Sequence, residues 1–230
     1  MNYLEDIQSR VLFEDNHLII INKRAGEIVQ GDKTGDITLI DKVKNYLKIK
    51  YQKPYNVFCG LVHRIDRPVS GVVVFTKTSK ALSRMNQLIK DRKFKKLYWA
   101  IVELPPEIKE QTLSSYIVKN EKLNKSFISF VEKPGYQKCE LSYKTVGSTE
   151  RYTLLEIILQ TGRHHQIRAQ LAANNTIIKG DLKYGAHRSN EDGSICLHAR
   201  KVEFEHPITH QLISVEAEPT TLIFRKIWGI

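Results

Sequence analysis

Short apolar runs, many of them rich in β-branched residues, recur along the chain between polar or glycine-bearing segments. Runs of this length and composition predict strands rather than long helices. The expected strands cover residues 11–13, 18–21, 72–76, 97–104, 152–159, 201–204 and 212–217. The stretch 107–147 is less regular and is expected to hold short strands and loops, for example at 127–131 and 139–146.

Three segments carry apolar residues at helical spacing. Asp36 and Ser79 are the expected N-caps of the first two helices, and the third is expected within residues 163–174. The apolar residues expected on the inner faces are Ile37, Ile40, Val43 and Leu47, then Leu82, Met85 and Ile89, then Ile167 and Leu171. Strands dominate and helices interrupt them irregularly, so the sequence predicts an α+β fold with a mixed sheet.

The length and charge of the chain limit the number of domains it can form and the class of partner it can bind. The 230 residues allow one large domain or two close-packed subdomains. No repeat, low-complexity tract or flexible linker divides the chain, so we expect a single domain over residues 1–230. The 36 Lys and Arg outnumber the 25 Asp and Glu, which gives a formal net charge of +11. Such an excess indicates binding to a polyanion, and the alternative is a solvated surface without a partner.

The positive charge is concentrated in two places. Residues 77–96 contain eight Lys or Arg against one acid, Asp91. The outer face of the first expected helix carries Lys42, Lys44, Lys48 and Lys50. Both groups are expected to contact phosphates if the partner is a nucleic acid.

The cysteines and the short apolar runs indicate in which cellular compartment the protein is expected. Cys59, Cys139 and Cys196 are scattered and form no CxxC motif, so neither a disulfide framework nor a zinc ribbon is indicated. The N-terminal segment has no apolar signal region, and the longest apolar runs are too short to cross a bilayer. We therefore expect a soluble, cytoplasmic protein with reduced thiols and no membrane association.

One carboxylate stands out because of its neighbours. Asp66 lies between Arg64 and Arg67 in a segment that Pro68 and Gly71 fix just before an expected buried strand. Loops held by a rigid scaffold often carry catalytic groups. Guanidinium groups that face Asp66 would keep it ionised, and an ionised carboxylate can act as a nucleophile. The alternative is an ordinary ion pair at the surface.

Two further clusters carry candidate chemistry. On a helix, Arg168 would lie four residues after His164 and three after His165, and the start of that helix could present N–H groups to an anion. Adjacent histidines do not share a helix face, and no further ligand stands at a suitable spacing, so a metal site is disfavoured. On a strand, Tyr98 and Trp99 point to opposite faces, and Tyr98 could stack on a base or simply pack in the core.

Five stretches taken together resemble the RluA family of pseudouridine synthases. They are HRIDRPVSGVVVFTK at 63–77, KKLYWAIV at 95–102, TGRHHQIRAQL at 161–171, GDLKYG at 180–185, and LHA at 197–199 followed by FEHP at 204–207. Their order and spacing match the family's catalytic domain, and the similarity extends over nearly the whole chain from about Val11. The resemblance implies the pseudouridine synthase catalytic fold, with a mainly antiparallel central sheet, flanking helices and a central RNA-binding cleft.

The resemblance also implies the reaction and the residues that perform it. The family isomerises uridine in RNA: the glycosidic bond breaks, the uracil turns, and C5 is rejoined to the ribose without any cofactor. Asp66 matches the catalytic aspartate, Tyr98 the tyrosine that stacks on the target base, and Arg168 the basic residue that pairs with the aspartate. The residues expected to bind substrate are His63, Arg64, Arg67, Ile167 and Leu171. Within that set, Arg64 is expected to enter the space left by the flipped base, and Ile167 and Leu171 to form apolar walls.

The chain departs from the family pattern at two places. His164 stands where the family usually has Thr, and Lys23-Arg24-Ala25-Gly26 replaces a Lys-Pro-x-Gly motif. Neither is expected to touch the aspartate, tyrosine or arginine. The residues before Val11 are expected to be too few for the S4-type RNA-binding domain that many relatives carry. The protein, which we expect to be a monomer, should therefore bind ribosomal or transfer RNA through its own basic surface.

Two other functions stay open at this point. One is a catalytically inactive RNA-binding protein of the same fold, which would have no need of a carboxylate in a cationic groove. The other is a nucleoside or glycoside hydrolase, which normally needs two carboxylates around the bond. The sequence offers one well-placed acid, so isomerisation is the preferred prediction.

Overall fold

The protein consists of two compact units. The structure is a computed structural model that describes residues 3–31 and 35–229. The first unit comprises Met1–Phe94 and Ala199–Thr220, and the second comprises Lys95–His198 and Thr221–Ile230. Each unit contains strands that pair with one another and has its own buried apolar cluster.

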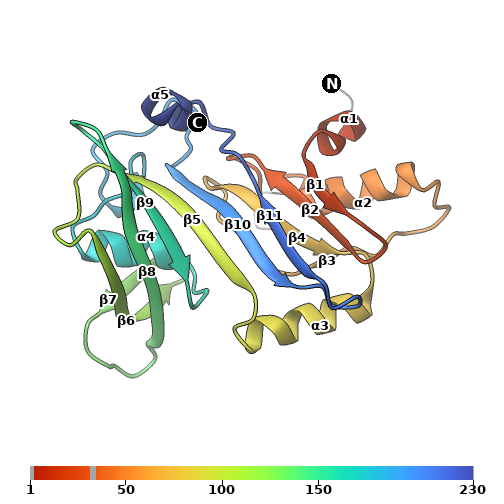
Figure 1. Cartoon of the computed structure of the whole chain (residues 1–230), viewed down its shortest axis with the longest axis horizontal. Coiled ribbons are helices and arrows are strands. Elements are labelled where there is room, and N and C mark those ends of the chain that lie inside the picture. The colour runs from red at the N-terminus through yellow and green to blue at the C-terminus, as the bar shows by residue number, and fades with distance from the viewer. Residues whose placement is uncertain (1–2, 32–34, 230) are drawn as a thin grey trace. The chain divides into compact units, whose positions relative to one another are not determined.

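The first unit is a small sheet with three helices (Figure 1). Its helices are α1 (Tyr3–Gln8), α2 (Leu39–Lys50) and α3 (Ser79–Lys90). Its strands are β1 (Val11–Glu14), β2 (Leu18–Lys23), β3 (Gly60–Leu61), β4 (Ser70–Thr76), most of β10 (Leu197–Glu205), and β11 (Leu212–Glu216). The order β1-β2-β4-β10 forms the sheet, β3 pairs with β4, and β11 pairs with β10. The pairs β1–β2, β2–β4, β3–β4 and β10–β11 are antiparallel.

The core of this unit forms where β2 and β4 pair. Leu18 and Ile20 on β2 and Val72 and Val74 on β4 are fully buried in one apolar cluster. Met85 covers this cluster from α3. Burying side chains of this size stabilises a fold by roughly 1.5–3 kcal/mol each, so β2 and β4, the strand that follows the expected catalytic loop, are firmly held.

The expected strands of this unit are confirmed, but the caps of its helices lie elsewhere. Thr38, not Asp36, caps α2: the Thr38 side chain accepts a hydrogen bond from the Asp41 amide. Ile37 therefore precedes the helix and is 61% exposed, so its assignment to the core is wrong. Thr78 rather than Ser79 caps α3. A threonine hydroxyl adjacent to a predicted cap can take the same role, and the sequence alone does not distinguish such neighbours.

The second unit is an antiparallel sheet in the order β5-β9-β8-β6-β7. Its elements are β5 (Lys95–Val102), β6 (Glu110–Asn120), β7 (Lys125–Ser129), β8 (Gln137–Ser148), β9 (Thr153–Leu159), α4 (Gln166–Ala173), the 3-10 helix η1 (Leu182–Tyr184) and α5 (Leu222–Trp228). Figure 1 shows α4 behind the sheet that β8 and β9 help to form, and α4 contacts β6, β7 and η1.

The strands predicted at 127–131 and 139–146 correspond to β7 and β8, and β7 is short as expected, but β6 and β8 span eleven and twelve residues and are longer than predicted. Their buried positions alternate with polar, exposed ones, so no long apolar run marks either strand. This is the pattern of a sheet with one face in water. No helix among residues 3–31 and 35–229 is long and apolar enough to cross a membrane.

A buried carboxylate joins three elements of the first unit. The Glu14 side chain, at the end of β1, is only 7% exposed and accepts hydrogen bonds from Lys50 Nζ at 2.7 Å, Tyr51 Oη at 2.6 Å and Lys77 Nζ at 3.0 Å. Burial alone would raise the pKa of Glu14. The hydrogen bonds from Lys50, Tyr51 and Lys77 outweigh burial and lower this pKa to about 2.

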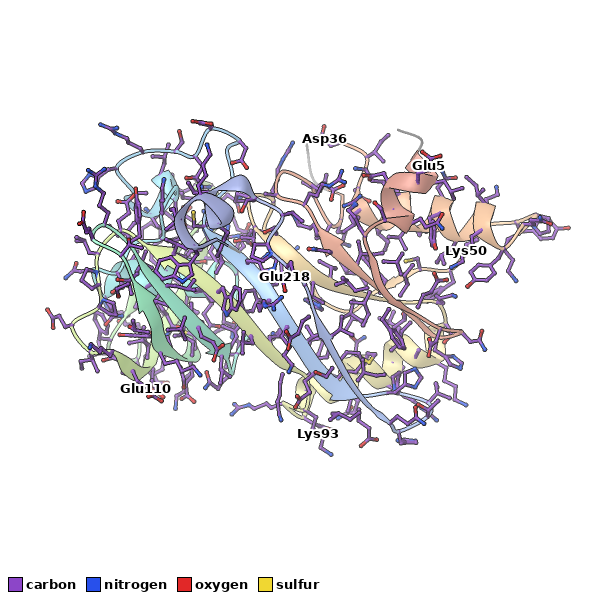
Figure 2. The ribbon with its side chains drawn as sticks, turned by 45° about the horizontal axis from the view of Figure 1, so that its top comes forward. Glu5, Asp36, Lys50, Lys93, Glu110 and Glu218 are labelled. Carbon is purple, nitrogen blue, oxygen red and sulfur yellow. The ribbon has the colours of Figure 1, made fainter. Side chains whose placement is uncertain are left out.

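We predict that Glu14 makes the free energy of unfolding of the first unit fall as the pH is lowered. A carboxyl group whose pKa falls on folding stabilises the fold fully above its ordinary pKa of about 4.5, and loses this contribution as the pH falls towards 2. Glu14→Gln should therefore lower the free energy of unfolding at pH 6 and flatten its decline between pH 4.5 and 2.5. Urea unfolding at a series of pH values measures both effects. Glu5→Gln, on the exposed side of α1 (Figure 2), is the control and should keep the wild-type pH dependence.

Candidate functional site

The segment that carries Asp66 is a loop between β3 and β4, attached to β4 at its start. The Val74 amide of β4 donates a hydrogen bond to His63 Nε2 at 3.3 Å. The His63 ring also packs against Phe94, with ring centroids 5.3 Å apart. His63, expected to bind substrate, therefore lies where it connects the loop to the core of its unit.

The end of the loop is fixed by a turn and a glycine. The Val69 amide donates to the Asp66 carbonyl at 3.1 Å, which closes a turn around Arg67 and Pro68. Gly71 follows with φ of +117°, and a Cβ at this position would lie 2.3–2.8 Å from the backbone of Ala199. A side chain would displace that backbone, so glycine is required for this close approach. Asp66, half-buried, thus lies in a loop with little freedom.

The two arginines beside Asp66 have different surroundings. Arg64 is exposed. Arg67 directs its guanidinium to another segment, where Nε donates to the Gly26 carbonyl at 3.1 Å and Nη1 lies 2.9 Å from Asp36 Oδ2. Arg67 therefore joins the Asp66 loop to the segment after β2.

The Lys23–Gly26 segment contacts this loop at Arg67, the residue after Asp66. The Gly26 amide donates to the Arg67 carbonyl at 2.8 Å. Lys23, whose side chain is completely buried, donates from Nζ to the same carbonyl at 3.1 Å and to the Arg24 carbonyl at 2.9 Å. The residue that follows Asp66 is thus bonded from both ends of this segment.

In the second unit, Arg168 forms a buried bidentate ion pair. Its Nε lies 2.7 Å from Asp181 Oδ2 and its Nη2 lies 2.8 Å from Asp181 Oδ1, and both side chains are at most 5% exposed. The guanidinium also lies over the ring of Tyr184, 5.1 Å from its centroid. Two parallel bonds and an aromatic face fix the orientation of the guanidinium group.

The helix that carries Arg168 begins later than predicted. His165 has φ of +52°, a left-handed conformation, and is the N-cap, so α4 starts at Gln166 and His164 lies before it. The prediction that His164 lies one helical turn before Arg168 is therefore wrong. Gln166 and Gln170, both buried, hold α4 on the sheet: Gln166 Nε2 donates to the Glu140 carbonyl of β8, and Gln170 Nε2 to the Leu113 carbonyl of β6.

The two histidines form a stack beside Tyr184. The rings of His164 and His165 are 3.8 Å apart and nearly parallel, and His165 Nδ1 lies 3.1 Å from the Tyr184 hydroxyl. Burial, assisted by the charges of Arg168, His164 and nearby lysines, lowers the pKa of His165 to about 2. His165 is therefore neutral at every ordinary pH. Among the described residues, no group of three His, Cys, Asp or Glu is placed to hold a metal ion.

The other expected site residues of this unit are buried. Tyr98 lies in the middle of β5, opposite Ile157 of β9, and is 6% exposed. Ile167 and Leu171 lie on α4 and are 5% and 0% exposed. Ile167, Arg168 and Leu171 thus share one helix, which packs on the same sheet that includes β5.

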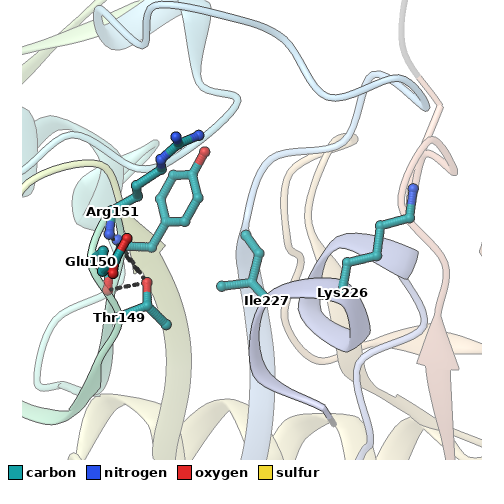
Figure 3. A pocket seen from close by; sticks show the side chains of 6 residues that line it. Thr149, Glu150, Arg151, Lys226 and Ile227 are labelled. Atoms are coloured by element: carbon teal, nitrogen blue, oxygen red, sulfur yellow. Dashed lines mark hydrogen bonds between the residues drawn. The ribbon is translucent and has the colours of Figure 1, made fainter.

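A shallow pocket of about 360 Å³ lies elsewhere in the second unit (Figure 3). It lies between the turn at residues 149–152 and α5, with Arg151 on one side and Lys226 and Ile227 on the other. Thr149 stabilises the turn, because its hydroxyl accepts a hydrogen bond from the Tyr152 amide at 3.0 Å. None of the expected site residues lines this pocket, so the pocket is not part of the expected active site.

Two residues with central contacts were not predicted from the sequence. Asp181 belongs to the GDLKYG stretch, which contributes to the family resemblance. Nothing in the sequence around Asp181 predicts its ion pair with Arg168. Lys23 ends the apolar run of β2, where a lysine normally marks the point at which a strand reaches water. Only its three-dimensional surroundings reveal a buried ammonium group.

Comparison with known proteins gives consistent results. A family model described as RNA pseudouridylate synthase matches residues 17–173. An uncharacterized RNA pseudouridine synthase, YhcT of Bacillus subtilis, is 35% identical over 213 residues, covering 90% of this chain and 67% of that protein. The ribosomal large subunit pseudouridine synthase C of Buchnera aphidicola (subspecies Acyrthosiphon pisum) is 31% identical over 226 residues, covering 94% of this chain and 69% of that protein. The structure of human RNA pseudouridylate synthase domain containing 4 shares the fold, with a TM-score of 0.82, 21% identity, and coverage of 97% and 94% of the two chains.

We predict that Asp181 stabilises the second unit by neutralising Arg168. Asp181→Asn would leave a buried guanidinium without its carboxylate, which typically costs about 3–5 kcal/mol in the free energy of unfolding. Urea unfolding measures this loss. The control is Glu121→Gln, which removes a pair with Lys119 in which Glu121 is 77% exposed, and should cost less than about 1 kcal/mol. Equal losses in the two variants would show that the Arg168–Asp181 pair is no more important than a surface contact.

Proposed function

Because the chain belongs to the RluA family of RNA pseudouridine synthases, we propose that it converts uridines of ribosomal RNA to pseudouridine with Asp66 as its catalytic carboxylate. The family makes the protein an isomerase that acts on RNA. The choice of ribosomal RNA rests on relatives named as ribosomal large subunit pseudouridine synthases. The choice of Asp66 rests on its motif and on the loop that carries it.

The observation that supports Asp66 most directly is the restraint on its loop. The loop is bonded to β4 through His63, closed by a turn at Val69, and joined to the segment after β2 through Arg67. A catalytic group must stay within a fraction of an ångström of its working position. Asp66 is half-buried in this loop and so meets that requirement while remaining within reach of a substrate.

The reaction balances without an oxidant or reductant. The bond between N1 of uracil and C1′ of ribose breaks, a bond between C5 and C1′ forms, C5 loses its proton, and N1 gains one. An ionised Asp66 would act at the ribose or the base while the uracil turns. The target base must first leave the RNA stack, at a cost of roughly a few kcal/mol.

We assign supporting roles to residues on both units. Arg64, which is exposed, is proposed to fill the space that the flipped base leaves in the RNA. Tyr98 is proposed to stack on the base, and Arg168 to supply a fixed positive charge to the reaction. The bidentate bond to Asp181 supports the last role, because it fixes the orientation of the guanidinium. Ile167 and Leu171 are proposed to limit water in the site.

We predict that Asp66→Asn abolishes isomerisation and leaves RNA binding nearly unchanged, because asparagine keeps the shape of the side chain and removes its charge. Tritium release from RNA labelled at C5 of uridine measures turnover, and a filter assay measures binding. Asp91→Asn, at the exposed C-cap of α3, is the matched control and should keep wild-type activity.

The same assay separates the competing functions. An Asp66→Asn variant with activity within tenfold of wild type would remove Asp66 from the catalytic role. Release of free uracil by the wild-type protein would indicate a hydrolase instead. Binding without tritium release or uracil release, on every ribosomal RNA tested, would favour an inactive RNA-binding protein.

We also predict that the basic run around residues 93–96 contributes unequally to RNA affinity. Lys93 (Figure 2) and Lys95 are exposed, whereas Lys96 is half-buried with a pKa lowered by burial. Lys93→Gln with Lys95→Gln should weaken binding and reduce the slope of log K against log salt by about one to two. The control is the double variant Lys119→Gln and Lys144→Gln, which removes the same net charge from two ion-paired lysines. Equal changes in both double variants would mean that Lys93 and Lys95 act only through net charge.

A further inference from the structure

We infer that Lys23 is a positioning residue for Asp66, because its buried ammonium group holds the backbone of the loop that carries this carboxylate. The inference rests on the proposed function, in which Asp66 is catalytic. It assigns Lys23 an indirect role, since the completely buried Lys23 side chain acts through the loop.

The contacts of Lys23 place its ammonium at the junction of two loops. Nζ donates to the carbonyl of Arg67, the residue directly after Asp66, and to the carbonyl of Arg24. The Gly26 amide donates to the same Arg67 carbonyl, and Arg67 Nε returns a bond to the Gly26 carbonyl. Loss of the ammonium would remove the charged donor from this group of bonds and loosen the peptide next to Asp66.

The charges around Lys23 come from three segments. Glu27 and Asp66 favour the ammonium form, whereas Arg10 and Arg67 oppose it. Glu27 is itself held by Arg10 Nη1 at 2.6 Å and Lys42 Nζ at 2.7 Å, so much of its charge is already neutralised. The electrostatic attraction between Lys23 and Asp66 is mutual.

A lysine is an expensive choice for this position. Burying an ammonium ion costs several kcal/mol unless partners replace its water, and an apolar residue would fill the same volume without that cost. Burial is the largest influence on Lys23 and lowers its pKa to about 7. A residue kept at such a cost, bonded to the backbone beside a carboxylate, is better explained by positioning than by packing.

The test compares Lys23→Met with Lys23→Arg in the full-length protein. Lys23→Met removes the ammonium and keeps most of the volume, and a displacement of the catalytic loop of this kind can lower kcat on the order of 100-fold. The KM for RNA should stay within about threefold, because Lys23 is buried and binds no phosphate. Lys23→Arg returns the charge and the donors, so it should recover part of kcat.

Two readouts separate positioning from general destabilisation. The first is the split between kcat and KM: kcat of Lys23→Met should fall while KM for RNA stays close to the wild-type value, because the loop is displaced and the RNA-binding surface is kept. The second is amide exchange: the amides of Gly26 and Val69, which bond to the carbonyls of Arg67 and Asp66, should exchange faster with solvent. The control is Leu18→Ala, a core truncation at the other end of β2. It should lower the melting temperature at least as much, yet leave kcat and both amides unchanged.

The outcomes distinguish this inference from the proposed function. An active wild-type protein whose Lys23→Met variant matches Leu18→Ala in kcat and amide exchange would overturn the role of Lys23 alone. Absence of pseudouridine formation by the wild-type protein would overturn the proposed function, and the positioning role with it. Faster exchange at Gly26 and Val69 together with a lowered kcat at unchanged KM would support the inference.

Discussion

A buried charge must find partners that replace water, and this constraint governs the interior of both units. In the first unit, Glu14 is surrounded by two lysines and two tyrosine hydroxyls, and Glu27 by an arginine and a lysine. In the second unit, Arg168 and Asp181 satisfy each other through two bonds. Each arrangement costs desolvation and is stable only when the geometry of all partners is correct. The compensation for that cost is orientation, since a group held by several directional bonds cannot turn.

The same constraint explains why charged networks lie next to loops rather than within the apolar cores. Regular strands satisfy their own backbone, whereas the segment after β2 and the Asp66 loop leave carbonyl groups that need donors. Lys23 and Arg67 supply those donors from side chains, and the Gly26 amide adds one from the backbone. Two irregular segments thereby become one bonded unit on the firm base of β2 and β4.

How much the sequence predicts depends on how local each feature is. The strands of the first unit are confirmed because β-branched runs such as 72–76 are local signals. The polar alternation of β6 and β8 hides two long strands, since their apolar faces never form a continuous run. The start of α4 depends on the left-handed conformation of His165, a non-glycine residue that sequence rules would leave in the helix.

The candidate site shows the same division. The motif around Asp66 identifies a loop, and this loop lies directly before the strand β4, as predicted. The partners of the charged groups come from distant parts of the chain: Asp181 lies 13 residues from Arg168, and Arg67 lies 44 residues from Lys23. Pairings of this kind follow from the packing of elements and have no signature in spacing, so Asp181 and Lys23 emerge only in three dimensions.

The internal ion pairs also bear on how the protein meets its RNA. Each pair, such as Lys42 with Glu27 or Lys50 with Glu14, uses one positive and one negative charge and leaves the net charge of +11 unchanged. The excess must therefore reside on cations outside such pairs. The helix face of α2, which the sequence marks as strongly basic, loses two of its four lysines to these pairs. Counting lysines along a helix thus overestimates its value for phosphate binding, because some of them are needed to neutralise buried carboxylates.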